Sequence, residues 1–199
     1  MAKAKRRVIS HYDFVRDLGR GALGEDIAEI FLQREFGVIA DNVSERNPDF
    51  DLLINHLDPA LSRKPRVVPK KLLRKIFKDS FGIVNRDEIT VEVKFDEAAA
   101  RYGNLFIEVF FDIRCGSPGA LFKCKADLFV WIVPAKKKFM IYVLKRPELL
   151  AWVFQYMFDN KNKISYKVPN ISPYARGIPV PVKAVAASPA CVGTFEFNL

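Results

Sequence analysis

The sequence predicts a mixed fold, α/β or α+β, in which helices cover a central sheet. Two observations carry this prediction. Short apolar or alternating segments, typical of strands, lie between two amphipathic segments that are typical of helices. Half of the 199 residues are apolar and 13% are aromatic, which supplies enough apolar surface for a core. We expect one domain over residues 1–163 and a proline-rich extension over residues 164–199, packed on this domain or exchanged with a second copy.

The first predicted element is a helix over residues 24–36, which Gly37 is placed to end. Its apolar stripe consists of Leu23, Ile27, Ile30 and Phe31. A short apolar strand follows at residues 51–54. Residues 89–95 alternate and predict a second strand, with Val91, Val93 and Phe95 on one face and Thr90, Glu92 and Lys94 on the other.

Residues 105–111 predict a third strand. Residues 127–133 and 138–144 predict a hairpin, and residues 147–158 an amphipathic helix with proline in its first turn. The apolar stripe of this helix consists of Leu149, Leu150, Val153, Phe154 and Met157. From residue 164 onwards we expect an irregular tail with short β pieces, such as residues 178–185.

A basic insertion lies between the first two strands, over residues 63–82. Pro69 is placed to open a helix there, and residues 63–78 hold eight basic side chains and no acid. Because the whole chain has a net charge of +9, an anionic partner is expected, and we favour DNA over a membrane surface. The expected phosphate contacts are Arg63, Lys64, Arg66, Lys70, Lys71, Arg74, Lys75 and Lys78. Alternatively, these basic side chains form a charged surface that is exposed to solvent and binds no partner.

Other features of the sequence argue against a membrane-spanning, secreted or zinc-binding protein. The longest strongly apolar run, Leu128–Val133, is far shorter than the roughly 20 residues of a membrane span. No long apolar stretch follows the basic start, so no secretory signal is expected. The three cysteines are too widely spaced for a disulfide framework or a zinc site. We therefore expect reduced thiols in a cytoplasmic compartment.

Four side chains form the candidate site: Glu25, Asp51, Glu92 and Lys94. Glu92 and Lys94 are two residues apart and share one face of their strand, and Asp51 lies beside Glu92 if the two strands pair. Carboxylates of this kind hold Mg²⁺, while a lysine can orient or deprotonate the attacking water and offset charge on a phosphate. This combination suits hydrolysis of a phosphodiester.

The segments Pro48-Asp49-Phe50-Asp51 and Val91-Glu92-Val93-Lys94 resemble the motifs of the PD-(D/E)XK nuclease superfamily. Gly21-Ala22-Leu23-Gly24-Glu25, placed at a helix start, looks like the first motif of archaeal Holliday-junction resolvases. Residues 103–108 and Ala126-Asp127 are similar to phage and bacterial members of the superfamily. About 40 residues separate Asp51 from Glu92, more than in the compact resolvases, so the basic insertion must be looped out.

The resemblance implies a restriction-endonuclease-like core and Mg²⁺-dependent DNA cleavage, with Mn²⁺ as a substitute. It assigns metal binding to Asp51 and Glu92, catalysis to Lys94, and an accessory ligand or water-positioning role to Glu25. It also implies a bacterial, archaeal or virus-infected cell, roles in recombination, repair or phage DNA processing, and a homodimer as one assembly state.

Several alternatives stay open at this stage. Asp49 has the same strand parity as Asp51, although we prefer Asp51 because the apolar strand starts directly after it. Glu108 either approaches the site from a neighbouring strand or lies at a solvated edge. Glu25 can instead be a first-turn glutamate favoured by the helix dipole. As whole functions, a non-catalytic nucleic-acid-binding module and an assembly protein are the alternatives to a nuclease.

Overall fold

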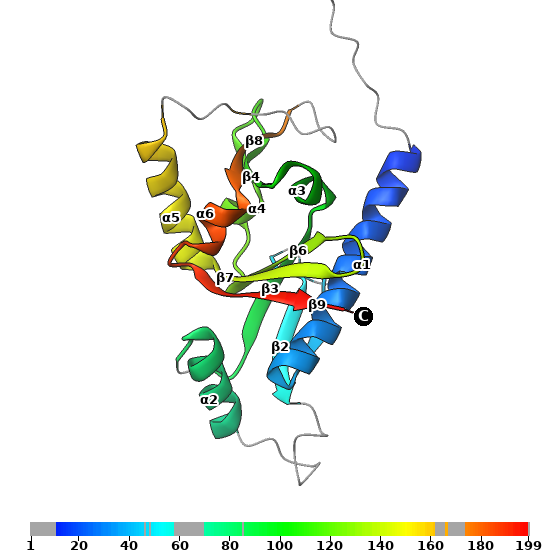
Figure 1. Ribbon diagram of the computed structural model, residues 1–199, viewed down its shortest axis with the longest axis vertical. Coiled ribbons are helices and arrows are strands. Elements are labelled where there is room, and N and C mark those ends of the chain that lie inside the picture. The colour runs from blue at the N-terminus through cyan, green and yellow to red at the C-terminus, as the bar shows by residue number, and fades with distance from the viewer. Residues whose placement is uncertain are drawn as a thin grey trace, which may run out of the picture.

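The structure is a computed structural model that describes residues 11–45, 47, 49–57, 70–84, 86–161, 166 and 174–198, without the side chains of residues 11–18, 56, 57 and 70–73. A six-stranded mixed sheet forms its centre, with helices and a smaller sheet packed against it (Figure 1). The predicted mixed α/β class with a central sheet flanked by helices is therefore confirmed.

The central sheet has the strand order β1-β2-β3-β6-β7-β9. Its strands are β1 (Val38–Asn42), β2 (Leu52–Leu57), β3 (Ile89–Phe95), β6 (Leu128–Pro134), β7 (Phe139–Lys145) and β9 (Cys191–Phe197). Neighbouring strands are antiparallel, except that β3 and β6 run parallel. The parallel pair requires a crossover connection, and the chain between its two strands supplies the short helices and part of the second sheet.

A second sheet of three strands has the order β5-β4-β8. It consists of β4 (Asn104–Asp112), β5 (Ser117–Pro118) and β8 (Arg176–Pro181), and it packs with α3 (Glu97–Tyr102), α4 (Ala120–Lys123), α5 (Arg146–Asp159) and α6 (Val182–Ala186). These elements share one apolar cluster with one face of the central sheet. The other face packs against α1 (His11–Phe36) and α2 (Lys70–Phe81) in a separate cluster. The central sheet is thus covered on both faces.

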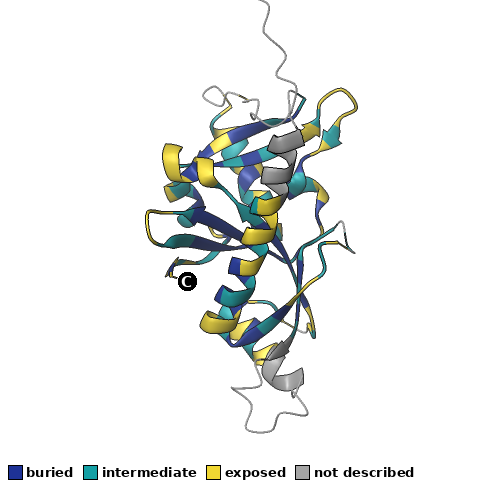
Figure 2. Ribbon diagram, turned by 90° about the vertical axis from the view of Figure 1, so that its right-hand side faces the viewer, coloured by how far each residue is buried: buried dark blue, intermediate teal, exposed yellow. Residues whose placement is uncertain are grey.

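The alternation predicted for β3 is confirmed. Val91 and Val93 are buried in the cluster under α1. The side chains of Glu92 and Lys94 therefore project to the opposite face, which the second sheet partly covers. Helix α1 lies close on this strand, because a Cβ atom on Gly24 would be 3.0 Å from the Cβ atom of Phe95. Figure 2 shows α1 in front of the buried strands, with exposed residues along its outer side.

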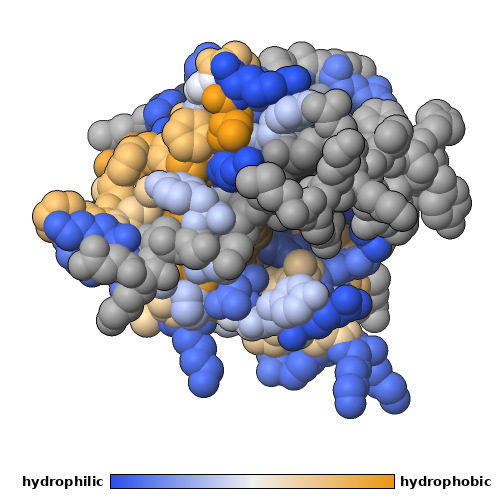
Figure 3. Space-filling model, turned by 90° about the horizontal axis from the view of Figure 1, so that it is seen from above, coloured by the Kyte–Doolittle hydropathy of each residue, from blue (hydrophilic) through white to orange (hydrophobic). Residues whose placement is uncertain are grey.

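Two helices differ in detail from their predicted form. Helix α1 begins at His11, well before the expected residue 24, and ends as predicted before Gly37, which adopts a φ of 65°. Leu23 is 44% exposed, so it lies outside the apolar stripe. In α5, Leu149 and Val153 are buried, but Phe154 is 55% exposed. The view from above shows apolar side chains at the surface on the side where α5 lies (Figure 3).

The pairing of strands β4, β8 and β9 differs from the expected topology. The strand predicted at residues 105–111 forms, but as β4 of the second sheet. The tail predicted to be irregular is mostly regular where it is described, with β8, α6 and β9 in succession. Strand β9 pairs with β7, and β8 pairs with β4, so this segment completes both sheets. The expected β piece at 178–185 is half strand and half helix, because α6 begins at Val182.

The basic helix predicted after Pro69 is present as α2. Its apolar side chain Phe77 is buried, while Arg74, Lys75 and Lys78 are exposed. Lys70 and Lys71 belong to the helix, but their side chains lie outside the described part of the structure. Arg63, Lys64, Arg66, Pro48 and Pro69 also lie outside the described residues. Among the described helices, none has the length and apolar character needed to cross a membrane.

Candidate active site

Asp51 lies where β2 and β3 separate. At this end of the strand pair, Leu52 is the first residue of β2 and is in register with Val91. Asp51 directly precedes Leu52, and its Oδ2 accepts a hydrogen bond from the backbone N–H of Val93 at 2.7 Å. The carboxylate therefore satisfies a backbone donor of β3 at the point where strand pairing stops. This bond fixes the Asp51 side chain beside the central part of β3.

Glu92 and Lys94 form an ion pair on the adjacent strand. Glu92 is only 8% exposed, and its Oε1 accepts a hydrogen bond from Nζ of Lys94. The Lys94 side chain keeps 35% of its surface exposed. On β6, the residues in register with this pair are Phe129 and Trp131, which are buried. The pair therefore lies between apolar side chains and solvent, where charge interactions are stronger than in bulk water.

The charges of these groups act on one another. Burial, followed by repulsion from Glu92, raises the pKa of Asp51 to about 6, although the Val93 N–H and the charge of Lys94 oppose the rise. Burial alone would lower the pKa of Lys94, but the charge and hydrogen bond of Glu92, helped by Asp51, outweigh it and raise that pKa. Lys94 is therefore a protonated ammonium at neutral pH.

Glu25 reaches the same region from α1. Its Oε2 accepts hydrogen bonds from Nδ2 of Asn42 at 2.6 Å and from Oγ of Ser44 at 3.0 Å. The charge of Glu25 also contributes to the raised pKa of Asp51. Because α1 begins at His11, Glu25 lies in the middle of the helix, so the interpretation as a first-turn glutamate is wrong. The expected placement of its motif at a helix start is wrong for the same reason.

Asp49 has a different environment. Its Oδ2 pairs with Nζ of Lys125 at 2.9 Å, and its backbone N–H donates to Oδ1 of Asn47 at 2.9 Å. These contacts tie the loop before β2 to the segment that precedes β6. Of the two aspartates that the sequence left open, Asp51 is the one whose charge interacts with Glu92.

Glu108 approaches the site from the second sheet. Its Oε2 accepts a hydrogen bond from the backbone N–H of Ala120 at 3.3 Å. Burial raises the pKa of Glu108, whereas the Ala120 N–H and the charge of Lys94 act in the opposite direction. Glu108 thus lies half-buried on a strand of the second sheet, and its approach to the site stays a prediction.

Three further residues of the site were not predicted. Asn42 and Ser44 hold Glu25; Asn42 ends β1 and Ser44 follows it, and the sequence analysis did not identify this strand. Cys124 is buried, and its thiol interacts electrostatically with both Glu92 and Lys94. No local pattern points to Cys124, because it follows a four-residue helix and is brought to the site by packing alone.

The donor set suits a hard divalent cation. In the part of the chain that the structure describes, no three His, Cys, Asp or Glu side chains are grouped closely enough to form a metal cage by themselves. Mg²⁺ does not require one, since it is commonly held by one or two carboxylates together with water and substrate phosphate. A bound cation would also reduce the electrostatic repulsion between the carboxylates of Asp51 and Glu92.

Comparison of the chain with models of protein families, with curated proteins and with solved structures finds no match.

Replacing Asp51 with asparagine should stabilise the protein at neutral pH. The amide can still accept the Val93 N–H, but it removes a charge whose folded-state pKa is raised from 3.8 to about 6. The folded protein binds this proton more tightly, so stability falls as pH rises from about 4 to 6. After allowance for solvent screening, Asp51→Asn should gain about 1–2 kcal/mol above pH 7 and nothing near pH 4.

Urea unfolding of both proteins between pH 4 and pH 8 measures this difference. Added Mg²⁺ should stabilise the wild-type protein more than the Asp51→Asn variant. A loss of stability at pH 7.5, or a difference that does not change with pH, would contradict the assignment.

Proposed function

We propose that the protein is a metal-dependent DNA endonuclease of the PD-(D/E)XK type. One observation carries the proposal: Asp51, Glu92 and Lys94, which occupy the three key positions of the motif, interact with one another at one point of the sheet. Asp51 is far in sequence from Glu92 and Lys94, so their convergence depends on the pairing of β2 with β3. Glu25 from α1 adds a further carboxylate.

In this proposal Asp51 and Glu92 hold Mg²⁺ or Mn²⁺, and Glu25 serves as an accessory ligand or orients water. When bound, the ion neutralises charge on the phosphate and lowers the pKa of a nearby water molecule. The carboxylates of Asp51 and Glu92 both interact with the single lysine Lys94, in a protein whose net charge is +9, and such a pair of carboxylates favours a cation.

Lys94 would act through its positive charge. Because Glu92 raises its pKa, the ammonium is protonated at neutral pH before a cation binds. The Lys94 side chain is partly exposed, and its ammonium is suited to donate hydrogen bonds to the scissile phosphate or to the attacking water. The expected products are 5′-phosphate and 3′-hydroxyl ends.

DNA binding would depend on basic side chains outside the site. In α2, Lys75 and Lys78 are exposed, while Arg74 is paired with Asp87 at 2.6 Å. Helix α2 packs in the cluster under α1, on the face of the sheet opposite to Glu92 and Lys94. These lysines would therefore contact backbone phosphates that flank the cleaved bond. Branched DNA in recombination or repair, and phage DNA during processing, are the substrates we favour.

Incubation of the purified protein with supercoiled plasmid tests the function. We expect nicked and linear products with Mg²⁺ or Mn²⁺, and none with EDTA. The Glu92→Ala variant, purified in the same way, controls for a contaminating nuclease. A salt-sensitive gel shift without cleavage would contradict the nuclease and favour a binding module. Neither cleavage nor binding would favour an assembly protein.

A further inference from the structure

Arg86 lies just before β3, and its guanidinium makes no hydrogen bond within the part of the chain that the structure describes. The side chain is 62% exposed, and its ion-pair partner there is Asp127, at 3.8 Å. This distance allows an ion pair but is too long for a hydrogen bond. Because a guanidinium has five N–H donors in a planar fork, Arg86 can bind an anion through two parallel hydrogen bonds.

The contacts of Asp127 place Arg86 on the face of the central sheet that carries Glu92. Oδ2 of Asp127 accepts hydrogen bonds from the backbone N–H and from Oγ1 of Thr90, both at 3.0 Å. Thr90 and Glu92 are two residues apart on β3, so their side chains share a face and lie about 6.6 Å apart along the strand. The guanidinium of Arg86 is therefore held beside the candidate site.

Lys125 is a second exposed cation on this face. Its Nζ lies 2.9 Å from Oδ2 of Asp49, and its backbone N–H donates to the carbonyl oxygen of Asp49 at 3.1 Å. Asp49 precedes Asp51 by two residues, and Phe50 between them packs against the apolar cluster on this face. Lys125 also precedes Asp127 by two residues, so both cations are held at the segment that leads into β6.

The proposed reaction requires phosphate contacts on this face. The scissile phosphate would lie next to Lys94 and to the cation held by Asp51 and Glu92, so the neighbouring phosphates of the same strand pass over the same face. The exposed lysines of α2 lie on the opposite face and suit phosphates further away. An exposed ion pair contributes little to stability, so Arg86 and Lys125 can exchange their carboxylate partners for phosphate.

We propose that Arg86 and Lys125 bind backbone phosphates of the DNA strand that is cleaved, next to the scissile phosphate. The inference rests on the proposed function. Arg86 binds its phosphate through two N–H donors, whereas Lys125 binds as a point charge. These contacts place the strand over Glu92 and Lys94 and do not read its sequence.

The first test is the salt dependence of DNA binding, measured in EDTA by fluorescence anisotropy with a labelled duplex. Each lost phosphate contact lowers the slope of log Kd against log salt concentration by about 0.9, and we expect this change in Arg86→Gln and in Lys125→Gln. At low salt each variant should bind the duplex about five-fold more weakly. Glutamine at residue 125 keeps an N–H donor for Asp49, and the backbone hydrogen bond stays, so the loop before β2 is preserved.

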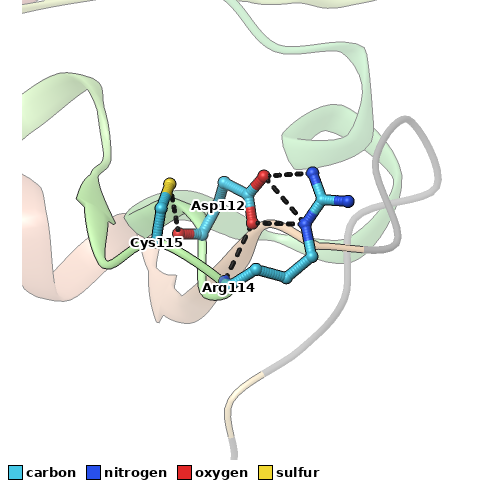
Figure 4. Close-up of polar contacts among 3 residues, drawn as sticks. All are labelled: Asp112, Arg114 and Cys115. Atoms are coloured by element: carbon cyan, nitrogen blue, oxygen red, sulfur yellow. Dashed lines mark hydrogen bonds and ion pairs between the residues drawn. The ribbon is translucent and has the colours of Figure 1, made fainter.

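Arg114→Gln is the matched control. Arg114 has a similar exposure, 60%, but its Nε donates to both carboxylate oxygens of Asp112, at 3.0 and 3.1 Å, at the β4–β5 turn (Figure 4). This variant removes the same charge as Arg86→Gln without a phosphate contact, so its slope should equal that of the wild-type protein. Arg86→Lys keeps the charge at residue 86 and should restore the slope.

The second test is cleavage at saturating DNA and Mg²⁺. A contact next to the cleaved bond positions the reacting phosphate, so Arg86→Gln should lower kcat about 10-fold as well as raise KM. A phosphate contact far from the cleaved bond would raise KM alone. Arg114→Gln should cut DNA at the wild-type rate.

Lower slopes in Arg86→Gln and Lys125→Gln, together with a lower kcat in Arg86→Gln, support the proposal. A wild-type slope in either variant overturns it, as does a normal kcat in Arg86→Gln. An equal change of slope in Arg114→Gln also overturns it, because the slope would then report net charge alone. If the wild-type protein binds the duplex but does not cut it, the proposed function fails, and the slopes still show whether the two cations bind phosphate. Absence of DNA binding overturns both.

Discussion

The Glu92→Ala variant is expected to lose metal-dependent plasmid cleavage, by at least about 100-fold. Glu92 is the buried member of the site, and both Asp51 and Lys94 interact with it. Its removal would take away one of two metal-binding carboxylates and the hydrogen-bond acceptor of Lys94 together. DNA binding should change little, because the expected phosphate contacts lie elsewhere. Cleavage of supercoiled plasmid and fluorescence anisotropy with a labelled duplex measure the two properties.

Two further variants make the result specific. Glu92→Gln keeps the size of the side chain and an acceptor for Lys94, and it should be as inactive as Glu92→Ala because the negative charge is lost. Glu88→Ala removes an exposed glutamate just before the same strand and should cut DNA at the wild-type rate. Wild-type cleavage by either Glu92 variant would show that the site has been assigned to the wrong residues.

The sequence predicts that Glu92 and Lys94 share one face of a strand, because this strand alternates between apolar and polar residues. The alternation over residues 89–95 fixes which side chains share a face, and burial of Val91 and Val93 follows the same pattern. The position of Asp51 at the start of a strand could be predicted because one short apolar segment follows the turn that Pro48 predicts. Local periodicity was informative here since one face of β3 is uniformly apolar.

The surroundings of the site could not be predicted, because they depend on contacts between distant segments. Strand β4 alternates as a strand should, but nothing local shows that it pairs with β8 near the C-terminus rather than with the central sheet. Glu108 was therefore ambiguous. The strand β1 that leads to Asn42 is only five residues long, and its pattern is weak. The role of β9 as an edge strand likewise depends on tertiary pairing.

Gly119→Ala is expected to cause the largest loss of stability, at least about 3 kcal/mol. The added Cβ atom would lie 2.1 Å from the backbone oxygen of Glu108 and 2.5 Å from its carbonyl carbon. These are backbone atoms of a paired strand, so they cannot turn aside as a flexible side chain would. The φ of Gly119 is −71°, which alanine adopts without strain, so the cost comes from the collision alone.

Gly21→Ala separates this collision from a general effect of replacing glycine. Gly21 lies within α1, and among the described residues nothing beyond the local helix backbone comes within 4 Å of an added Cβ atom. Alanine there should therefore stabilise the helix by about 0.5–1 kcal/mol. Urea unfolding of both variants measures the two changes. Opposite signs would show that α4 is pressed against β4 at Gly119, whereas wild-type stability of Gly119→Ala would mean that α4 is free to move.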